Sequence, residues 1–411
     1  MIFALLLVPV TFAVGMGIDY ASAARKKSQL NAAADAAALA AVTPAMMAQS
    51  DANAIAAAKN MFNAQVANIP GLNFNPTNLT VTVTDSGLSR TVVVTYGASS
   101  KNAFAGIIGR TTMALSGSST AASSVPPNID FYLLLDSSPS MAIAATTAGI
   151  NTMVSNTSSQ GGCAFACHET NPSADNLGNP GGEDNYALAR NLGVTLRIDL
   201  LTQAAQNLMT TAQNAAASNN ASYRMAIYTF DVNFNTIQTL TSNLSTAQTQ
   251  AGNIQMLEVY DNNCLTKSNC NSDTDTNYDN AMTNINSVMP NPGSGTNAVG
   301  DSPQEVLFFV TDGVEDESVS GSRVQSLMSN GWCTTIKNRG IRIAVLYTTY
   351  LPLPTNSWYN TYIAPFQPNI ASNMQNCASP GLFFQVSTDG DISAALAALF
   401  QQAVATARLT H

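Results

Sequence analysis

"FYLLLDSSPSMA", residues 131–142, begins as an uninterrupted apolar run and turns polar at Asp136. An apolar run of this kind is typical of a strand that is covered on both faces in a parallel sheet. The polar part is an aspartate and hydroxyl series, Asp136-x-Ser138-x-Ser140. Because ligands bind beyond the carboxyl ends of strands in open α/β sheets, the change predicts a binding site at the end of a buried strand.

The chain after Pro127 alternates apolar strands with helical segments, which predicts an α/β fold with a doubly wound, mostly parallel sheet. The expected strands are 129–135, 224–230, 306–311, 341–347 and 382–386. The expected helices are about 195–217, 277–289, 321–338 and 390–408. The strand at 306–311 ends in Thr311-Asp312-Gly313, so we expect a second carboxylate at the same edge of the sheet.

The polar residues at this edge are candidates for metal ligands. Hard divalent cations prefer oxygen ligands, and Mg²⁺ keeps several waters while taking few protein ligands, which suits Asp136, Ser138, Ser140, Thr276 and Asp312. Thr296 competes with Thr276, but it stands too close to the strand at Val306 for the helix expected between them. Ser and Asp also cap helices and form turns, so the D-x-S-x-S series alone does not indicate a metal site. The second aspartate, at the end of the strand 306–311, is what makes a metal site the better interpretation.

Residues 129–408 resemble a von Willebrand factor type A domain, whose metal-ion-dependent adhesion site uses D-x-S-x-S, a threonine and a later aspartate in this order. The resemblance implies that the five residues named above hold Mg²⁺, or alternatively Mn²⁺ or Ca²⁺. It also implies a non-enzymatic protein whose ion binds an acidic group on a protein partner. Relative to that family, 141–193 and 243–275 are long insertions in a domain at 128–411, and we expect both to border the metal face.

Residues 1–18 carry no charge and extend roughly 27 Å as a helix, near the thickness of a hydrocarbon core, which predicts a transmembrane anchor at 1–20. A cleaved signal peptide with an A-x-A site at 21–23 is the alternative, although no basic region precedes the apolar run. The basic residues at 25–27 favour a cytoplasmic location for the rest of the chain, whereas the cysteines favour the opposite side. A basic segment missing ahead of Met1 would remove this conflict.

Residues 21–116 are predicted to form a module of helices and a β-hairpin, and the Ser/Ala-rich segment 117–127 a linker. The expected helices are about 19–42 and 50–67, and the expected strands are 79–84, 90–97 and 112–119. The apolar face of the first helix is mostly alanine, which permits close packing against its own domain or against a partner.

The N-terminal span followed by "DYASAARKKSQLNAAADAAALAA" (19–41) resembles TadE/TadG-like proteins of the tight-adherence (Tad, Flp) pilus system. Some members of that group carry a C-terminal von Willebrand A domain. The resemblance implies a protein of the bacterial cell envelope, anchored in the inner membrane with its bulk periplasmic or extracellular. Pilus or secretion components would be its partners.

The net charge of −9 argues against a nucleic-acid partner, because affinity for a polyanion needs clustered cations. The even number of cysteines predicts disulfides. In sequence order the cysteines form the pairs Cys163/Cys167, Cys264/Cys270 and the more distant Cys333/Cys377. The pairs that lie close together in sequence are the first candidates for bridges. The sequence does not determine the pairing.

Two other classes of function compete with metal-dependent adhesion. One is a metal-independent structural subunit of a pilus or an envelope scaffold, which would work through packing of the N-terminal helices. The other is a redox protein with haem at Cys167-His168, but three residues rather than two separate Cys163 from Cys167. An enzyme is not expected, because the chain contains no G-x-S-x-G, H-E-x-x-H or phosphate-binding loop motif.

Overall fold

The computed structural model describes residues 2–173, 179, 181–260, 274–297, 299–350, 352, 357–387 and 390–407, with side chains from Pro9 onward. The chain divides into two compact units, Met1–Val125 and Pro126–Thr410. Each unit has a sheet and a hydrophobic core of its own.

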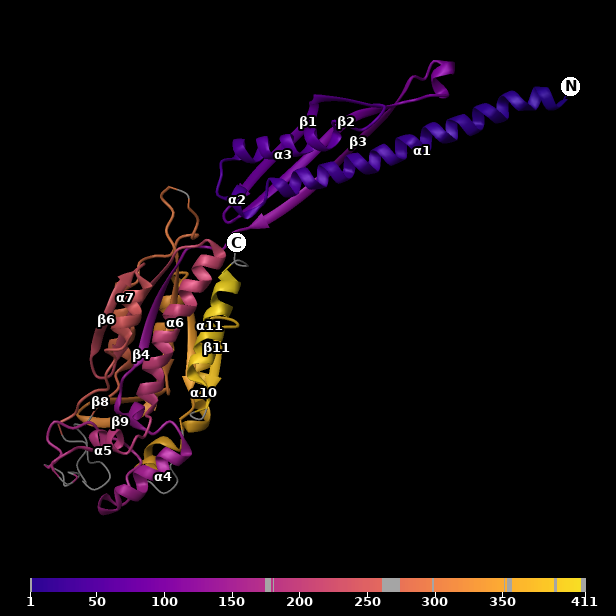
Figure 1. The fold of residues 1–411 in the computed structure, drawn as a ribbon. Helices are drawn as coiled ribbons and strands as arrows, with labels where there is room; N and C mark the ends of the chain where they lie inside the picture. Colours follow the sequence, from indigo (N-terminus) through magenta and orange to yellow (C-terminus); the bar gives the residue numbers. More distant parts are fainter. Residues whose placement is uncertain are drawn as a thin grey trace. The chain divides into compact units, whose positions relative to one another are not determined.

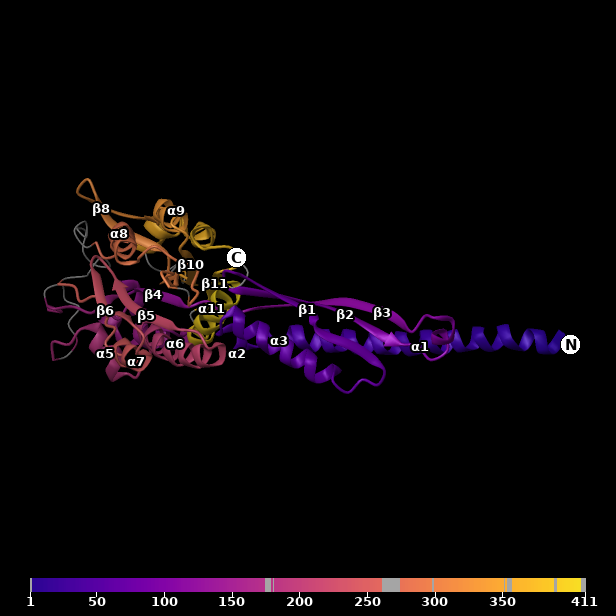
Figure 2. The ribbon, with the colours of Figure 1, turned by 90° about the horizontal axis from the view of Figure 1, so that it is seen from above.

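The first unit packs helices against a three-stranded antiparallel sheet of order β1-β2-β3 (Figure 2). Its helices are α1 (Ile2–Ala40), α2 (Pro44–Met47) and α3 (Asp51–Val66). Its strands are β1 (Leu72–Ser86), β2 (Ser89–Lys101) and β3 (Thr112–Ser124), and a short 3-10 turn at Ala105–Ile108 precedes β3. Among the described residues, no helix combines the length and the apolar character needed to cross a membrane.

The alanine face of α1 is buried within the first unit. It shares one core with side chains of α3 and β2, namely Leu30, Ala34, Ala37, Ala58, Phe62, Val92 and Val94. Because alanine side chains are short, α1 can approach its neighbours closely. Of the two roles predicted for this face, packing against its own domain is the one observed.

Two charged side chains of α1 bind the end of β2 and the loop that follows it. Lys26 is 6% exposed, and its Nζ donates to Ser100 Oγ at 2.9 Å. The Asp19 carboxylate accepts hydrogen bonds from the backbone N–H groups of residues 103–105 at 2.8, 3.0 and 2.7 Å. In the folded chain, Lys26 therefore does not belong to an exposed basic cluster at 25–27.

The linker predicted at 117–127 is wrong for its first part. Residues 117–124 continue β3 and pair with β2 from Gly117 opposite Tyr96 to Ser124 opposite Ser89. Small Ser and Ala side chains are compatible with an edge strand as well as with a linker, so composition alone did not separate the two.

The second unit contains a six-stranded sheet of order β11-β10-β7-β4-β5-β6. All neighbouring strands are parallel except β5 and β6, which confirms the predicted mostly parallel sheet. The strands are β4 (Ile129–Asp136), β5 (Tyr223–Phe230), β6 (Phe234–Thr241), β7 (Gln304–Thr311), β10 (Arg342–Thr348) and β11 (Phe383–Val386). The antiparallel edge strand β6 was not predicted.

Helices cover both faces of this sheet; Figure 1 looks onto one face, and Figure 2 shows helices on both sides of the strands. One face carries α6 (Arg197–Asn219), α7 (Leu244–Ala251) and α11 (Ile392–Ala407), whose core includes Leu133 and Phe308. The other carries α8 (Tyr278–Val288), α9 (Gly331–Asn338) and α10 (Ile370–Cys377), whose core includes Leu134 and Phe309. Successive strand residues point to opposite faces, so one apolar run supplies both cores.

The inserted segment 141–193 contains α4 (Thr147–Asn156) and α5 (Asn185–Asn191), and the segment 243–275 contains α7. Short helical turns occur at Pro139–Ala142, Ser158–Gln160, Tyr359–Ile363 and Gln367–Asn369.

The helix predicted at 321–338 is wrong for its first half. Residues 314–327 form a hairpin of β8 (Val314–Val319) and β9 (Ser322–Leu327), and α9 begins only at Gly331. Ser320 and Gly321, which join the strands, both have positive φ, at 54° and 82°. A two-residue turn with positive φ matches the twist of a hairpin and cannot continue a right-handed helix.

One of the predicted disulfides is observed. Cys333 of α9 and Cys377 of α10 form a buried disulfide. Cys163 and Cys167 are not joined, so the predicted bridge between them is wrong in this structure; the side chain of Cys167 is hydrogen bonded to Cys163 instead. Cys264 and Cys270 lie outside the described residues.

The Cys333–Cys377 bridge closes a loop of 44 residues and should stabilise the second unit by about 4 kcal/mol through the unfolded chain. We expect the C333S/C377S variant of the full chain to lose that much free energy of unfolding in a urea titration. The difference from wild type should disappear when both proteins are measured in a thiol reductant. A difference that persists in reductant would assign the effect to packing rather than to the crosslink.

Candidate metal centre

The pairing of β4 with β7 brings two predicted ligands together. The strands run in parallel with Leu135 opposite Val310, so Asp136 and Asp312 both follow at the same edge of the sheet. Both side chains are fully buried, at 0% exposure. Buried carboxylates of like charge at one strand edge create a strong local demand for positive charge.

The D-x-S-x-S loop turns its hydroxyls toward these carboxylates. The backbone N–H and the Oγ of Ser138 both donate to Asp136 Oδ1, at 3.0 and 2.6 Å. Ser138 Oγ lies 3.0 Å from Ser140 Oγ, and the Ser140 hydroxyl lies close enough to Asp312 to lower the pKa of that carboxyl. Three of the five residues predicted as ligands, Asp136, Ser138 and Ser140, therefore form one hydrogen-bonded network, and Asp312 lies beside it.

Thr276 lies beside this network, on the wall of the same cavity as Ser140. Its backbone exchanges two 3.0 Å hydrogen bonds with Asp316, and its side chain is buried, at 4% exposure. Thr296 is placed elsewhere. The carbonyl of the preceding residue, Gly295, accepts from Asn128 at the start of β4, which is the opposite end of the strand from Asp136.

Two residues of the network were not predicted. Thr311 Oγ1 donates to Asp136 Oδ2 at 2.6 Å and lies 2.6 Å from the hydroxyl of Tyr278 in α8. A signal for Thr311 was available, since it precedes Asp312 at the strand end and its register places it beside Asp136. Tyr278 had no such signal, because an aromatic residue in a helix is usually a core residue.

Arg197, the first residue of α6, is the third residue that sequence reasoning missed. Its guanidinium is fully buried, with Nη1 3.6 Å from Asp312 Oδ2. Arg197 follows a long insertion and lies far in sequence from both aspartates, so no sequence motif includes it. The ion pair is incomplete, because Asp312 Oδ2 and Arg197 Nη1 are both buried without a hydrogen-bond partner.

The electrostatics of the two carboxylates fit a cation. Burial, reinforced by the charge of Asp312, raises the pKa of Asp136 to about 7. Burial also raises the pKa of Asp312, while Arg197 and the Ser140 hydroxyl oppose that shift. The unpartnered Asp312 Oδ2 is the kind of buried acceptor that a metal ion satisfies.

The donor set determines which metals suit the site. No cluster of three or more His, Cys, Asp or Glu side chains suited to a metal occurs in the part of the chain that the structure describes. Any ion at this edge would therefore take hydroxyl, carbonyl or water oxygens beside the carboxylates. Hard divalent cations accept such ligands, whereas soft metals prefer thiolate and imidazole.

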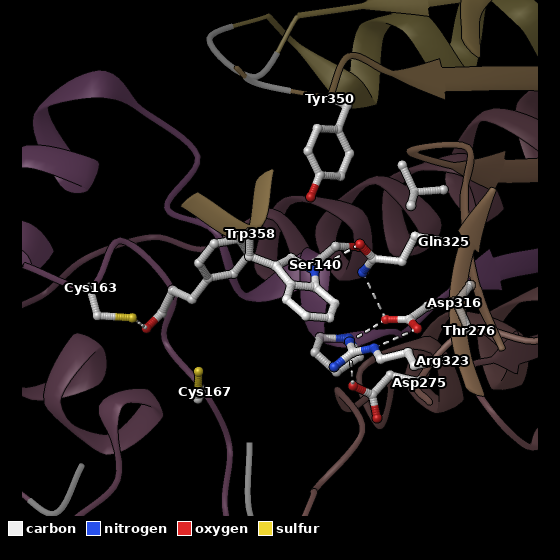
Figure 3. Close-up of a pocket in the computed structure, with 13 residues that line it drawn as sticks. Ser140, Cys163, Cys167, Asp275, Thr276, Asp316, Arg323, Gln325, Tyr350 and Trp358 are labelled. Atoms are coloured by element: carbon white, nitrogen blue, oxygen red, sulfur yellow. Dashed lines mark hydrogen bonds and ion pairs between the residues drawn. The ribbon is translucent and has the colours of Figure 1, made fainter. Parts of the chain in front are cut away.

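A cavity of about 120 Å³ opens between Ser140, Thr276 and three surrounding segments (Figure 3). Cys163, Phe165 and Cys167 of the inserted segment line one side. The thiol of Cys163 is buried, but its hydrogen bond with Cys167 lowers its pKa. The insertion at 141–193 thus borders the candidate centre.

The β8–β9 hairpin and Trp358 form the opposite wall of the cavity (Figure 3). Arg323 forms an ion pair with Asp316, and its guanidinium carbon lies 5.1 Å from the ring centre of Trp358. Trp358 Nε1 donates to Gln325 Oε1 at 2.8 Å. These contacts hold a polar and aromatic wall beside the network.

His168, the residue that the haem alternative uses as a ligand, makes two contacts within its own domain. Its Nδ1 lies 2.8 Å from Asp184 Oδ2, and its ring stacks on Tyr186 at 4.5 Å. The pKa of His168 is raised, chiefly by this hydrogen bond. The imidazole is thus held by its own domain.

Residues 1–58 match the family model described as "Putative Flp pilus-assembly TadE/G-like". The TadE/TadG-like resemblance predicted from residues 19–41 is confirmed by this match. No curated protein matches the chain by sequence.

Several solved structures are similar to this chain over part of its length. One is the von Willebrand factor domain of the type V pili tip protein Mfa5 from Porphyromonas gingivalis, at 10% identity and a TM-score of 0.38, covering 70% of this chain and 97% of that one. BatB from Bacteroides thetaiotaomicron has 13% identity and a TM-score of 0.34, covering 68% and 100%. Proximal thread matrix protein 1 of the mussel byssus, with zinc in its metal-ion-dependent adhesion site, has 13% identity and a TM-score of 0.33, covering 68% and 46%. At these scores the likenesses carry no argument about function.

The raised pKa of Asp136 predicts a pH effect on stability in chelator. The folded state keeps a proton on this carboxyl up to a pH of about 7, whereas the unfolded chain loses it near 3.8. Stability should therefore fall as pH rises between these values, by at most about 1.4 kcal/mol per pH unit from this group.

Thermal unfolding of wild type and D136N in EDTA, from pH 4 to 8, checks this expectation. The slope should be shallower in D136N, and the part that remains belongs to other buried acids, such as Glu305, whose pKa burial raises to about 9. Equal slopes in the two proteins would contradict the assignment to Asp136.

Proposed function

We propose that this chain is a non-enzymatic pilus-assembly or adhesion protein of the bacterial envelope that binds a protein partner through a metal ion. Asp136, Ser138, Ser140, Thr276 and Asp312 would hold the ion at the carboxyl edge of the sheet. The observation that carries the proposal is a buried pair of carboxylates. The charge of Asp312 acts on Asp136, and Asp312 Oδ2 is buried without a hydrogen bond.

Mg²⁺ suits this donor set best, with Mn²⁺ or Ca²⁺ as alternatives. When bound, the ion supplies positive charge and a coordination position for an oxygen of the partner. The chain's own residues fix the geometry. Ser138 and Thr311 orient Asp136 through hydrogen bonds at both carboxylate oxygens, and Ser140 lies beside Asp312.

An acidic group is the partner chemistry that this site favours. Carboxylate oxygens are hard ligands, and a carboxylate brings the negative charge that a cation attracts. The match of residues 1–58 to a pilus-assembly family supports pilus or secretion components as the source of that group. Enzymatic activity is not part of the proposal, and His168, which is hydrogen bonded to Asp184, is not one of the residues of the network.

A second function, a metal-independent scaffold, is favoured by one specific observation. Arg197 already places a positive charge 3.6 Å from Asp312, so the edge is partly compensated without an ion. In that case the second unit would act through its surfaces alone. Ion binding separates the two functions.

Calorimetric titration of the full-length protein with MgCl₂ tests the proposal. D136A should lower Mg²⁺ affinity at least about a hundredfold, because it removes a charged ligand and about 3 kcal/mol of interaction. The matched control is D130A, which removes a buried carboxylate from the opposite end of the same strand, where Asp130 pairs with Arg224. D130A should bind Mg²⁺ as wild type does, and absence of Mg²⁺ binding by wild type would favour the scaffold.

We also propose that the apolar residues 1–20 anchor the chain in the inner membrane, with the second unit on the periplasmic or extracellular side. Val10 and Val14 of α1 are 56% and 60% exposed, so their side chains lie open to a surrounding medium. V10K/V14K should release the protein from the membrane fraction after an alkaline wash, since each lysine costs about 3 kcal/mol at a membrane centre.

The matched control for this experiment is L39K, because Leu39 is 61% exposed near the other end of the same helix. L39K should remain in the membrane fraction. Recovery of V10K/V14K with the membranes in the same yield as wild type would refute the anchor.

A further inference from the structure

Arg197 has an unusual position for a cation in this fold. Its side chain is among the largest that are fully buried, and Nη2 donates to the carbonyl of Thr349 at 2.9 Å, just beyond β10. Its backbone N–H donates to the carbonyl of Ile143 at 3.0 Å. The first contact holds the guanidinium, the second holds the start of α6, and Arg197 is not among the residues that line the cavity beside Ser140.

The guanidinium is oriented toward Asp312 without completing a bond to it. Nη1 lies 3.6 Å from Asp312 Oδ2, and Nε and Nη1 have no hydrogen-bond partner. A structural arginine normally satisfies its five donors with carboxylates and carbonyls. Its main contribution here is therefore charge at a distance rather than a closed hydrogen-bond network.

The charges at this edge can be counted. When both carboxylates are ionised, as metal ligands are, Asp136 and Asp312 together with one guanidinium, which does not lose its proton in proteins, carry one net negative charge. A bound divalent cation changes this to one net positive charge. In a buried, low-dielectric site an uncompensated charge is costly.

On this basis, which rests on the function proposed above, we infer that Arg197 is a positioning residue that makes ion binding depend on an anionic ligand. Without Arg197 the two aspartates would neutralise the ion completely, and a water would serve as well as an acid in the open position. With Arg197 the ion alone leaves an excess positive charge, which a carboxylate from the partner cancels.

Because binding free energies are reciprocal, an acid that strengthens ion binding is itself bound more tightly by the ion, by the same factor. Arg197 also attracts Asp312 Oδ2, so it competes with the ion for this oxygen until the acid arrives. The protein would then hold its ion weakly alone and firmly in the presence of an acidic partner.

Acetate serves as the probe for the acidic group, and acetamide is its neutral isostere. In calorimetric titrations of the full-length protein with MgCl₂, saturating acetate should raise the Mg²⁺ affinity of wild type about tenfold or more, and acetamide should not. In R197M, Mg²⁺ alone should bind about tenfold more tightly than in wild type, and the acetate effect should fall below about twofold.

Three controls keep the charge effect apart from a structural one. R197K retains the charge but not the planar fork, and it should keep most of the acetate effect. R197Q, which is polar and neutral, should behave as R197M does and serves as the test if R197M does not fold in Mg²⁺. R224Q removes an arginine paired with Asp130 at the opposite end of β4, and it should match wild type.

Two different failures can be told apart. If wild type binds no Mg²⁺ with or without acetate, the proposed function itself is wrong. If wild type binds Mg²⁺ but R197M or R197Q keeps the full acetate effect, or R197K loses it, the role assigned to Arg197 is overturned while the metal centre stands.

Discussion

The second unit depends on the parallel register of β4 and β7, because that register buries two carboxylates at one edge of the sheet. Leu135 stands opposite Val310, and the chain turns polar immediately after each strand, at Asp136 and Thr311-Asp312. Burial of one ionised carboxylate is costly, and a second close to it adds repulsion. The hydroxyl groups and the guanidinium near this edge reduce the cost of burying these carboxylates.

Hydrogen bonds reduce part of the cost, and positive charge must reduce the rest. Ser138 and Thr311 donate to the two oxygens of Asp136, at 2.6 Å each, so that carboxylate is well satisfied locally. Asp312 is not, since its Oδ2 has no hydrogen bond and its nearest cation, Arg197, remains at 3.6 Å. An arginine in direct contact would satisfy Asp312 Oδ2 with a hydrogen bond. Arg197 instead donates to the carbonyl of Thr349, so this oxygen keeps its charge without a hydrogen bond.

The sequence predicts those parts of the fold and the site that depend on local pattern. The apolar strands and the polar residues at their ends place Asp136 and Asp312 together, since parallel strands share a carboxyl edge. Arg197 is out of reach, because its role depends on α6 starting beside Asp312 after a long insertion. Hydrophobic periodicity predicts helix over 321–330, whereas the positive φ of Ser320 and Gly321, which makes the hairpin, is a property of the backbone. The five residues as a ligand set remain a prediction.

Because the alanine face of α1 is buried within the first unit, this face is not free to pack against a partner protein. A scaffold that recruits partners through this face would have to separate α1 from Phe62 and the β2 core, and also break the contacts of Lys26 with Ser100 and of Asp19 with residues 103–105. Because folded domains are only about 5–15 kcal/mol more stable than the unfolded chain, exposing this core would endanger the fold of the first unit itself. Packing by that face is therefore internal, and a partner of the first unit must use other residues of α1 or the sheet. The unsatisfied carboxylate at the β4–β7 edge is then the stronger basis for partner binding, because there the folded protein gains rather than loses contacts when a ligand arrives.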